Sequence, residues 1–347
     1  MFNMKHLLIP AMAVCVACAT QAADNYTVTV PLSTDYNNNR AHIVNYDSGD
    51  TLATSVVENG RVIFKGSVEQ PVMARMSVGG RNVSLFVLEP GEIVLDNNMN
   101  ASGTELNRKL STVSDSLETI VGNIQGISSQ NDSTAFAGRK ALEAQYYAVM
   151  DNAIRANSDN PIGYYFFVQK MVEDLESLPT ILKQYPAFAN MVRVRKMTDM
   201  LAKMQATGPG NRFTDFTIPQ PDGTKASLSD YVGVGKWMLV DFWASWCGPC
   251  MREIKVLKDI LSEYGPDKLG VVGVAVWDDV ENTKAAIKRM QIPWPQILDC
   301  QQVPTDIYGV MGIPCILLVD PQGNIVSRGL QGDDLRAAVR AALNPEE

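Results

Sequence analysis

The sequence predicts three parts: an N-terminal β-sandwich-like domain, a helical segment and a C-terminal α/β domain. The chain has 347 residues, more than one compact core usually holds. Apolar residues make up 46% of it and charged residues 20%, which is typical of globular domains. The apolar period changes from strand to helix near residue 104, and strands alternate with helices after residue 212. We therefore place the three parts at residues 23–103, 104–206 and 207–347.

The first 22 residues are typical of an export signal. The apolar stretch from Leu7 to Ala19 is too short for a convincing membrane span. Small residues at Thr20 and Ala22 fit cleavage by a signal peptidase. The alternative is lipid attachment at Cys18. We expect simple cleavage and export to the periplasm or cell envelope.

Seven segments that follow the signal are predicted to be strands, because they alternate in polarity or are rich in β-branched residues. Turn formers separate them, and Asn59-Gly60 is the clearest hairpin signal, since this pair suits a tight two-residue turn. The pattern is typical of an antiparallel sandwich. The predicted strands are Tyr26–Leu32, Ala41–Tyr46, Thr51–Val57, Arg61–Lys65, Val72–Val78, Asn82–Leu88 and Glu92–Leu95.

Apolar residues recur at helical spacing from about Thr104 to Met204. Pro161 and Pro179 suit first turns of helices or breaks between them. The aromatic run Tyr164–Phe167 is either a partner-binding surface or a buried core patch. We favour the core, because apolar residues continue after the run. The turn formers at 207–211 then end the helical pattern and mark a domain boundary.

The C-terminal part alternates between strands and helices, which indicates an α/β sheet with helices on both faces. A hairpin is predicted first, and a strand pair with a final helix closes the domain. The predicted strands are Phe216–Ile218, Ala226–Leu228, Met238–Trp243, Val271–Val276, a strand near Ile297, Ile316–Val319 and Ile325–Arg328. The predicted helices are Cys250–Tyr264, Glu281–Met290, a short one near Ile307 and Asp333–Leu343.

Two cysteines lie two residues apart in Trp246-Cys247-Gly248-Pro249-Cys250, directly after an apolar strand. A helix that begins here puts the first sulfur at its positive N-terminus, which stabilises a thiolate. A thiolate attacks a target disulfide, and a second nearby thiol resolves the mixed disulfide. We expect Cys247 to attack and Cys250 to resolve. Pro249 presets the first helical turn, and Gly248 lets a substrate backbone approach closely.

Asp241 lies six residues before Cys247 within an otherwise apolar strand. Burial there would raise the pKa of its carboxyl group and make it a proton acceptor for Cys250. The alternative is a structural carboxylate with no catalytic part. Trp246 is a candidate apolar platform beside the nucleophile, whereas Trp243 ends an apolar run and is as well explained by core packing.

Residues 212–347 resemble the thioredoxin-fold domain of the exported TlpA/ResA-like thiol-disulfide oxidoreductases. The segments 240–250, 308–314 and 318–323 carry the resemblance. It implies that Ile313-Pro314 is a cis-proline loop that lies beside the cysteine pair and binds substrate as an added strand. It also implies that Asp241 occupies the place of thioredoxin's buried aspartate. The preceding part is similar to the β-rich domain, of unknown role, found before such domains in exported proteins of Bacteroidetes-type bacteria.

Cys315 departs from the family pattern, which commonly has threonine after the cis-proline. In this fold it would lie close to Cys247, where it could serve as a resolving thiol, contact substrate or form a second redox pair with Cys300. We favour the alternative that each is a small buried residue, since free cysteine packs well in cores. Removal of the signal leaves Cys247, Cys250, Cys300 and Cys315, all in the C-terminal third.

The direction of the reaction follows from the resemblance. The Gly-Pro pair between the cysteines and the isoleucine before the cis-proline are similar to reducing thioredoxins, whereas the oxidising DsbA type has Pro-His. We therefore expect a protein-disulfide reductase that acts on disulfide-containing proteins and receives electrons from an inner-membrane thiol donor. A disulfide isomerase and a non-enzymatic binding protein of the cell envelope are the alternatives. The presence of both cysteines counts against the second.

Composition excludes several other classes. The net charge of -8 argues against nucleic-acid binding. His42 is the only histidine left after signal removal, and no phosphate loop or dinucleotide-binding glycine pattern occurs, so we expect neither a metal nor another cofactor. A peroxiredoxin would need threonine where Ala244 stands. The oligomeric state is left open.

Overall fold

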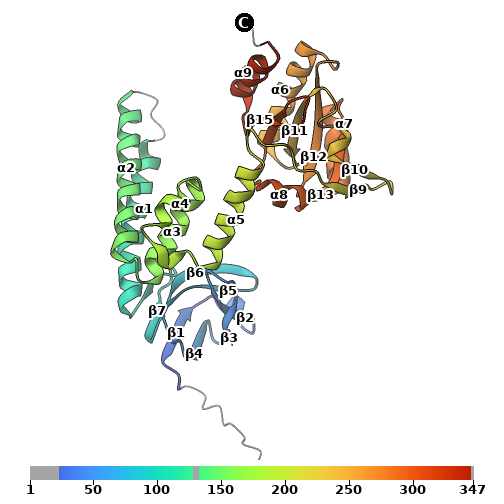
Figure 1. Ribbon diagram of the computed structural model, residues 1–347. Helices are drawn as coiled ribbons and strands as arrows, with labels where there is room; N and C mark the ends of the chain where they lie inside the picture. The colour runs from blue at the N-terminus through green and yellow to red at the C-terminus, as the bar shows by residue number, and fades with distance from the viewer. Residues whose placement is uncertain (1–22, 128–132, 345–347) are drawn as a thin grey trace, which may run out of the picture. The chain divides into compact units, whose positions relative to one another are not determined.

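The computed structural model describes residues 23–127 and 133–344 (Figure 1). Contacts divide the chain into two compact units, which meet in sequence between Glu173 and Asp174. The expected export signal and the alternative lipid site at Cys18 lie outside the described residues. No helix of the described ranges is both long and apolar enough to cross a membrane.

The first unit is β-rich and then helical, as the sequence predicts. Its strands form two four-stranded sheets, ordered β4-β1-β7-β8 and β3-β2-β5-β6. Inward residues of both sheets share one core, for example Val28, Phe64, Ile43 and Phe86. The strands are β1 (Tyr26–Pro31), β2 (Arg40–Asn45), β3 (Thr51–Val56), β4 (Arg61–Gly66), β5 (Val72–Val78), β6 (Arg81–Leu88), β7 (Gly91–Leu95) and β8 (Ala101–Ser102).

One pairing corrects the expected antiparallel sandwich. Strands β1 and β7 run parallel, with Tyr26 opposite Gly91 and Thr29 opposite Val94. Five strands separate these two in sequence, so no hairpin forces them to be antiparallel. Strand β8 was not expected, because two residues are too short for an alternating pattern.

Helices α1 (Glu105–Ile127), α2 (Ser133–Ala156) and α3 (Pro161–Glu173) complete the first unit. A buried amide ties α1 to β6: Asn107 Oδ1 accepts the N–H of Val87 at 2.9 Å, and Asn107 Nδ2 donates to the Val87 carbonyl at 2.7 Å. The Glu89 carboxylate accepts the backbone N–H of Leu106 at 2.9 Å, which satisfies a free donor at the start of the helix. These bonds fix where α1 leaves the sheet.

The aromatic run Tyr164–Phe167 lies on α3 and packs inside the first unit. Tyr164, Phe166 and Phe167 are buried. The Tyr165 ring meets the Tyr46 ring edge to face at 5.4 Å, and Tyr164 OH donates to Asp47. The core alternative is therefore the correct reading of this run.

The second unit is an α/β domain with a five-stranded sheet ordered β13-β12-β11-β14-β15. The first three strands in this order are parallel to one another, β14 runs antiparallel to β11, and β15 runs antiparallel to β14. The strands are β9 (Thr217–Pro219), β10 (Lys225–Ser227), β11 (Trp237–Trp243), β12 (Leu269–Val276), β13 (Gln296–Gln301), β14 (Cys315–Val319) and β15 (Ile325–Arg328). The helices are α4 (Leu178–Leu182), α5 (Val192–Ala206), α6 (Gly248–Tyr264), α7 (Val280–Met290), α8 (Val303–Tyr308) and α9 (Gly332–Leu343).

Helix α5 belongs to the second unit, although its sequence pattern continues that of the earlier helices. Thr207, which ends it, donates from Oγ1 to the Tyr308 carbonyl at 3.1 Å. The Arg328 guanidinium donates to Thr207 Oγ1 at 2.8 Å and to the Gly309 carbonyl at 3.2 Å. This polar cluster joins the end of α5 to the segment that leads into the Ile313-Pro314 loop.

The central strand β11 has both faces covered, as the α/β prediction required. Met238, Val240 and Phe242 pack with the β9-β10 hairpin and Tyr308 of α8 on one face. Leu239 and Trp243 pack with α6, α7 and α9 on the other. Because side chains alternate along a strand, Asp241 belongs to the face that α6 covers.

Candidate active site

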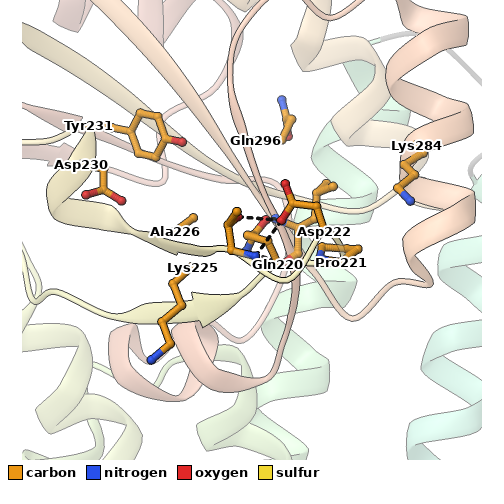
Figure 2. Close-up of a pocket in the computed structure, with 11 residues that line it drawn as sticks. Gln220, Pro221, Asp222, Lys225, Ala226, Asp230, Tyr231, Lys284 and Gln296 are labelled. Carbon is orange, nitrogen blue, oxygen red and sulfur yellow. Dashed lines mark hydrogen bonds between the residues drawn. The ribbon is translucent and has the colours of Figure 1, made fainter.

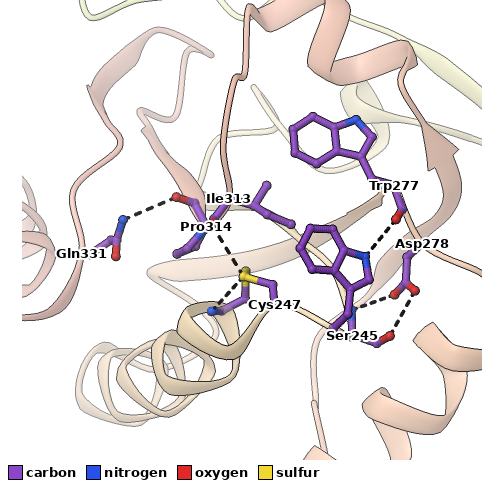
Figure 3. The surroundings of a disulfide bond; sticks show 9 residues. Ser245, Cys247, Trp277, Asp278, Ile313, Pro314 and Gln331 are labelled. Carbon is purple, nitrogen blue, oxygen red and sulfur yellow. Dashed lines mark hydrogen bonds between the residues drawn. A yellow bond between two sulfur atoms is a disulfide. The ribbon is translucent and has the colours of Figure 1, made fainter. Parts of the chain in front are cut away.

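A pair of cysteines lies at the start of α6, directly after the segment that connects β11 to this helix (Figure 3). Cys247 is the N-cap of the helix, and Cys250 lies in its first turn. The two sulfurs form a disulfide of 1.99 Å, with Cα atoms 5.2 Å apart. The backbone N–H of Cys250 donates to Cys247 Sγ at 3.1 Å. This donor and the positive helix end stabilise negative charge on the Cys247 sulfur when the pair is reduced.

The Ile313-Pro314 peptide bond is cis, as the resemblance implies. The Ile313 carbonyl oxygen lies 3.6 Å from Cys247 Sγ, so the two segments, 66 residues apart in sequence, meet at this sulfur. Figure 3 shows Ile313 and Pro314 facing the helix start that carries Cys247. A carbonyl group in this position beside the sulfur is suited to pairing with the backbone of an extended substrate.

The cysteines themselves are enclosed, and their surroundings are open. Cys247 is 4% exposed and Cys250 is 1% exposed, so the two residues differ little in exposure. Gly248, Pro249 and Trp246 are exposed beside them, and Trp246 keeps 61% of its surface. These neighbours form an exposed rim around Cys247.

Asp241 is completely buried beneath the dithiol helix. Burial raises the pKa of its carboxyl group to about 8, and the nearby Glu253 carboxylate adds to the rise. Among the described residues, Asp241 Oδ1 has no hydrogen-bond partner. A carboxyl group with this pKa exchanges protons near neutral pH, which general base catalysis requires.

Glu253 was missed by the sequence analysis. It follows Cys250 by three residues on the inner face of α6, and it is buried. Its Oε1 accepts the N–H of Gly332 at 2.8 Å, so it also connects α6 to the start of α9. The available signal was an acidic residue on the apolar face of an amphipathic helix, one turn after Cys250.

The two tryptophans near the dithiol have different environments. Trp243 is buried, and its Nε1 donates to Gln296 Oε1 at 2.9 Å. Trp246 is exposed, and its Nε1 donates to the Trp277 carbonyl at 2.9 Å. The platform predicted beside the nucleophile is thus available from Trp246, and Trp243 is a core residue.

The remaining thiols, Cys300 and Cys315, are free and buried. Burial raises the pKa of both, which keeps them protonated near neutral pH. Strands β12 and β11 lie between their strands, so they are about 14 Å apart at ordinary strand spacing, beyond the reach of a disulfide. The second redox pair considered from the sequence does not form.

Cys315 follows Pro314, but its side chain packs in the cluster of the sheet face opposite the Cys247 cluster. The cause is the alternation of side chains along β14, in which Ile316 and Leu318 point toward α6 and Cys315 and Leu317 point away. Its position favours the buried-residue reading over a resolving thiol.

A separate hollow of about 470 Å³ lies beside the β9-β10 hairpin and β13 (Figure 2). Its charged lining has both signs, Asp222 and Asp230 with Lys225 and Lys284. Lys284 already pairs with Glu281 at 3.0 Å. The hollow therefore favours no ligand of particular charge. Across the described ranges, no group of three or more His, Cys, Asp or Glu side chains is arranged to hold a metal ion.

Fold and site together define a class: a thioredoxin-fold domain with a redox-active dithiol at a helix N-terminus, faced by a cis-proline loop. Residues 209–328 match the model of the AhpC/TSA family, and residues 26–114 match a domain of unknown function, DUF4369. The chain is 28% identical to the thiol-disulfide oxidoreductase ResA of Geobacillus thermodenitrificans over 35% of its own length and 68% of that protein.

The chain is also 32% identical to the thioredoxin-like protein YneN of Bacillus subtilis, over 33% of this chain and 68% of that protein. The solved thioredoxin domain of a thiol-disulfide oxidoreductase from Bacteroides vulgatus is 31% identical, with 39% of this chain and 98% of that one covered and a TM-score of 0.35. The chain belongs to the thioredoxin-like thiol-disulfide oxidoreductases, and it is an enzyme of that class.

Proposed function

We propose that this protein is an exported reductase that transfers electrons from its dithiol to disulfides in other proteins. The observation that carries the proposal is the Cys247–Cys250 disulfide at the N-terminus of α6, with the Cys250 N–H directed at the Cys247 sulfur. This arrangement favours a thiolate at Cys247 in the reduced protein. The thiolate is the form that attacks disulfides.

In the first step, the Cys247 thiolate attacks one sulfur of the target disulfide. A mixed disulfide forms between Cys247 and the target, the target's S–S bond breaks, and the second target sulfur leaves as a thiolate that takes a proton from solvent. The cis-proline loop supports this step, because the Ile313 carbonyl lies 3.6 Å from Cys247 Sγ, where it can accept an N–H from the bound target chain. Trp246, Gly248 and Pro249 form the exposed rim that the target contacts.

In the second step, Cys250 resolves the mixed disulfide. Its thiol loses a proton and attacks the Cys247 sulfur, so the internal disulfide forms and the target leaves with its remaining sulfur reduced. Asp241 in its ionised form is the proposed acceptor of that proton. Because its pKa is about 8, the protonated form predominates at neutral pH, and the step belongs to the ionised fraction, which grows as pH rises toward 8. Two electrons thus pass from the dithiol to the target.

The direction and the location are part of the proposal. The Gly-Pro pair between the cysteines is similar to reducing thioredoxins, for which a potential of about -270 mV is typical, against about -120 mV for DsbA. The N-terminal 22 residues are typical of an export signal to the periplasm or cell envelope. An exported reductase needs electrons from outside its own compartment, so a membrane thiol donor is the proposed partner.

The test is a redox titration against glutathione combined with an insulin-reduction assay. We expect a potential close to that of thioredoxin and turnover of insulin that Cys247→Ser abolishes. A potential near the DsbA value would contradict the reductase direction. Refolding of a scrambled disulfide protein with little insulin turnover would favour an isomerase instead.

A further inference from the structure

Two of the three residues between β11 and Cys247 are held from outside the dithiol helix. The polypeptide leaves β11 at Trp243 and reaches Cys247 through Ala244, Ser245 and Trp246. Ser245 and Trp246 are each hydrogen-bonded to the segment that directly follows β12, at Asp278 and Trp277 respectively. Figure 3 shows these contacts beside the disulfide, with Asp278 directed at Ser245. We name this pair of contacts the β12 latch.

The carboxylate of Asp278 is the centre of the latch. It accepts the backbone N–H of Ser245 at 2.7 Å and its hydroxyl at 3.0 Å. It also accepts the Thr283 hydroxyl at 2.8 Å and the N–H of Asp279 at 2.9 Å. Asp278 is only 9% exposed. A carboxylate held by four donors at the start of α7 is a fixed anchor, because the hydrogen bonds fill both of its oxygens.

Trp277, the residue before Asp278, makes the second contact of the latch, and its backbone conformation is strained. Trp277 has a φ of 53°, in the left-handed region that a bulky residue rarely adopts. In this conformation its carbonyl accepts the Trp246 indole N–H at 2.9 Å. Strained backbone of this kind persists where the surrounding structure fixes it, often at functional sites. Gln301 holds the backbone on both sides: its carbonyl accepts the Trp277 N–H at 3.3 Å, and its side chain donates to the Asp278 carbonyl at 2.9 Å.

The latch and the thiolate depend on different groups. Charge on the Cys247 sulfur is stabilised from within α6, by the Cys250 N–H at 3.1 Å. The Trp246 ring is held by the Trp277 carbonyl, and the backbone directly before it is held at Ser245 by Asp278. Loss of the latch should therefore weaken contact with the target chain and leave the reactivity of the Cys247 thiol unchanged.

We propose that Asp278 is a positioning residue that sets how the protein binds polypeptide disulfides, acting through Ser245 on the exposed Trp246. This inference rests on the proposed reductase function and names a residue that determines its substrate class. That class is disulfides carried by a peptide chain, which contacts the rim, whereas small disulfides reach only the sulfur.

The experiment compares Asp278→Ala with Asp279→Ala. The control loses the same charge one residue away and also removes contacts at the start of α7, because Asp279 accepts the N–H groups of Glu281 and Asn282. It has no bond to Ser245. Turnover is measured with insulin and with 2-hydroxyethyl disulfide, using dithiothreitol to reduce the enzyme. Alkylation of reduced Cys247 by iodoacetamide reports the thiol directly.

For Asp278→Ala we expect KM for insulin to rise about tenfold while kcat stays within about twofold. This pattern indicates that an interaction present in both the bound substrate and the transition state has been lost. The kcat/KM for 2-hydroxyethyl disulfide and the alkylation rate should match those of Asp279→Ala. Ser245→Ala keeps the backbone bond and should raise KM for insulin by about twofold to threefold. If Asp278→Ala does not fold, this variant and Trp246→Phe, which removes the indole donor and keeps an aromatic ring, carry the test.

An equal KM for insulin in the Asp278 and Asp279 variants would overturn the proposal, as would an equal loss with both substrates. Failure of the reductase proposal would look different. The unaltered protein would then not reduce insulin, or Cys247→Ser would reduce it as well.

Discussion

The buried carboxyl group of Asp241 leads to a prediction of how the free energy of unfolding depends on pH. Its pKa is about 8 in the folded protein and 3.8 is its ordinary value. Between these limits the folded state holds a proton that the unfolded chain has released. The free energy of unfolding therefore falls as pH rises from about 4 to about 8 and loses this dependence above pH 8.

The size of this change in the free energy of unfolding follows from the pH interval between the two pKa values. Each pH unit within it costs about 1.36 kcal/mol for one proton, so the Asp241 contribution changes by about 2.5 kcal/mol between pH 5 and pH 7. Asp241→Asn has a nearly identical shape and no titrating proton. As pH rises from 5 to 7, we therefore expect Asp241→Asn to become more stable relative to the unaltered protein by about 2.5 kcal/mol.

The assay is denaturant unfolding of the oxidised proteins, followed by tryptophan fluorescence. All five tryptophans, at 237, 243, 246, 277 and 294, lie in the second unit, so the signal reports the domain that contains Asp241. Glu253→Gln removes the second cause of the raised pKa and should move the upper limit of the interval to lower pH. Parallel stability curves for Asp241→Asn and the unaltered protein from pH 5 to pH 7 would refute the argument.

Three further outcomes are expected. Cys315→Ala should leave the redox potential unchanged and insulin turnover within about twofold, because the Cys315 side chain packs on the sheet face away from the disulfide. Asn107→Ala should destabilise the first unit by about 2–4 kcal/mol in circular dichroism, since Val87 loses two buried hydrogen bonds, and should leave the tryptophan transition unchanged. Trp246→Ala should change stability by less than about 0.5 kcal/mol, because the side chain is exposed, and should raise KM for insulin in steady-state assays.

The sequence was sufficient to predict most elements of the second unit, because the strands are short apolar runs bounded by glycine and proline. Helix α6 begins at Gly248, directly after the cysteine that the motif places at its start. The cis bond before Pro314 came only from the resemblance. Nothing in a turn pattern distinguishes a cis from a trans proline.

Long-range contacts were not predictable in the same way. The parallel pairing of β1 with β7 depends on the order of strands in space, which polarity patterns do not contain. Asp278 follows an apolar strand and has the sequence pattern of an ordinary loop residue, yet its carboxylate holds a segment 33 residues earlier. Glu253 similarly acquires its importance from burial beside Asp241. Such residues are recognised only when the fold brings their partners together.

The central claim is that Cys247 attacks the target and Cys250 releases it. The most direct measurement uses Cys250→Ser, reduced and mixed with insulin, followed by mass spectrometry of the trapped species. The account predicts a mixed disulfide between Cys247 and an insulin cysteine, with no such adduct in Cys247→Ser. An adduct at Cys315, or undiminished insulin reduction by Cys247→Ser, would contradict it.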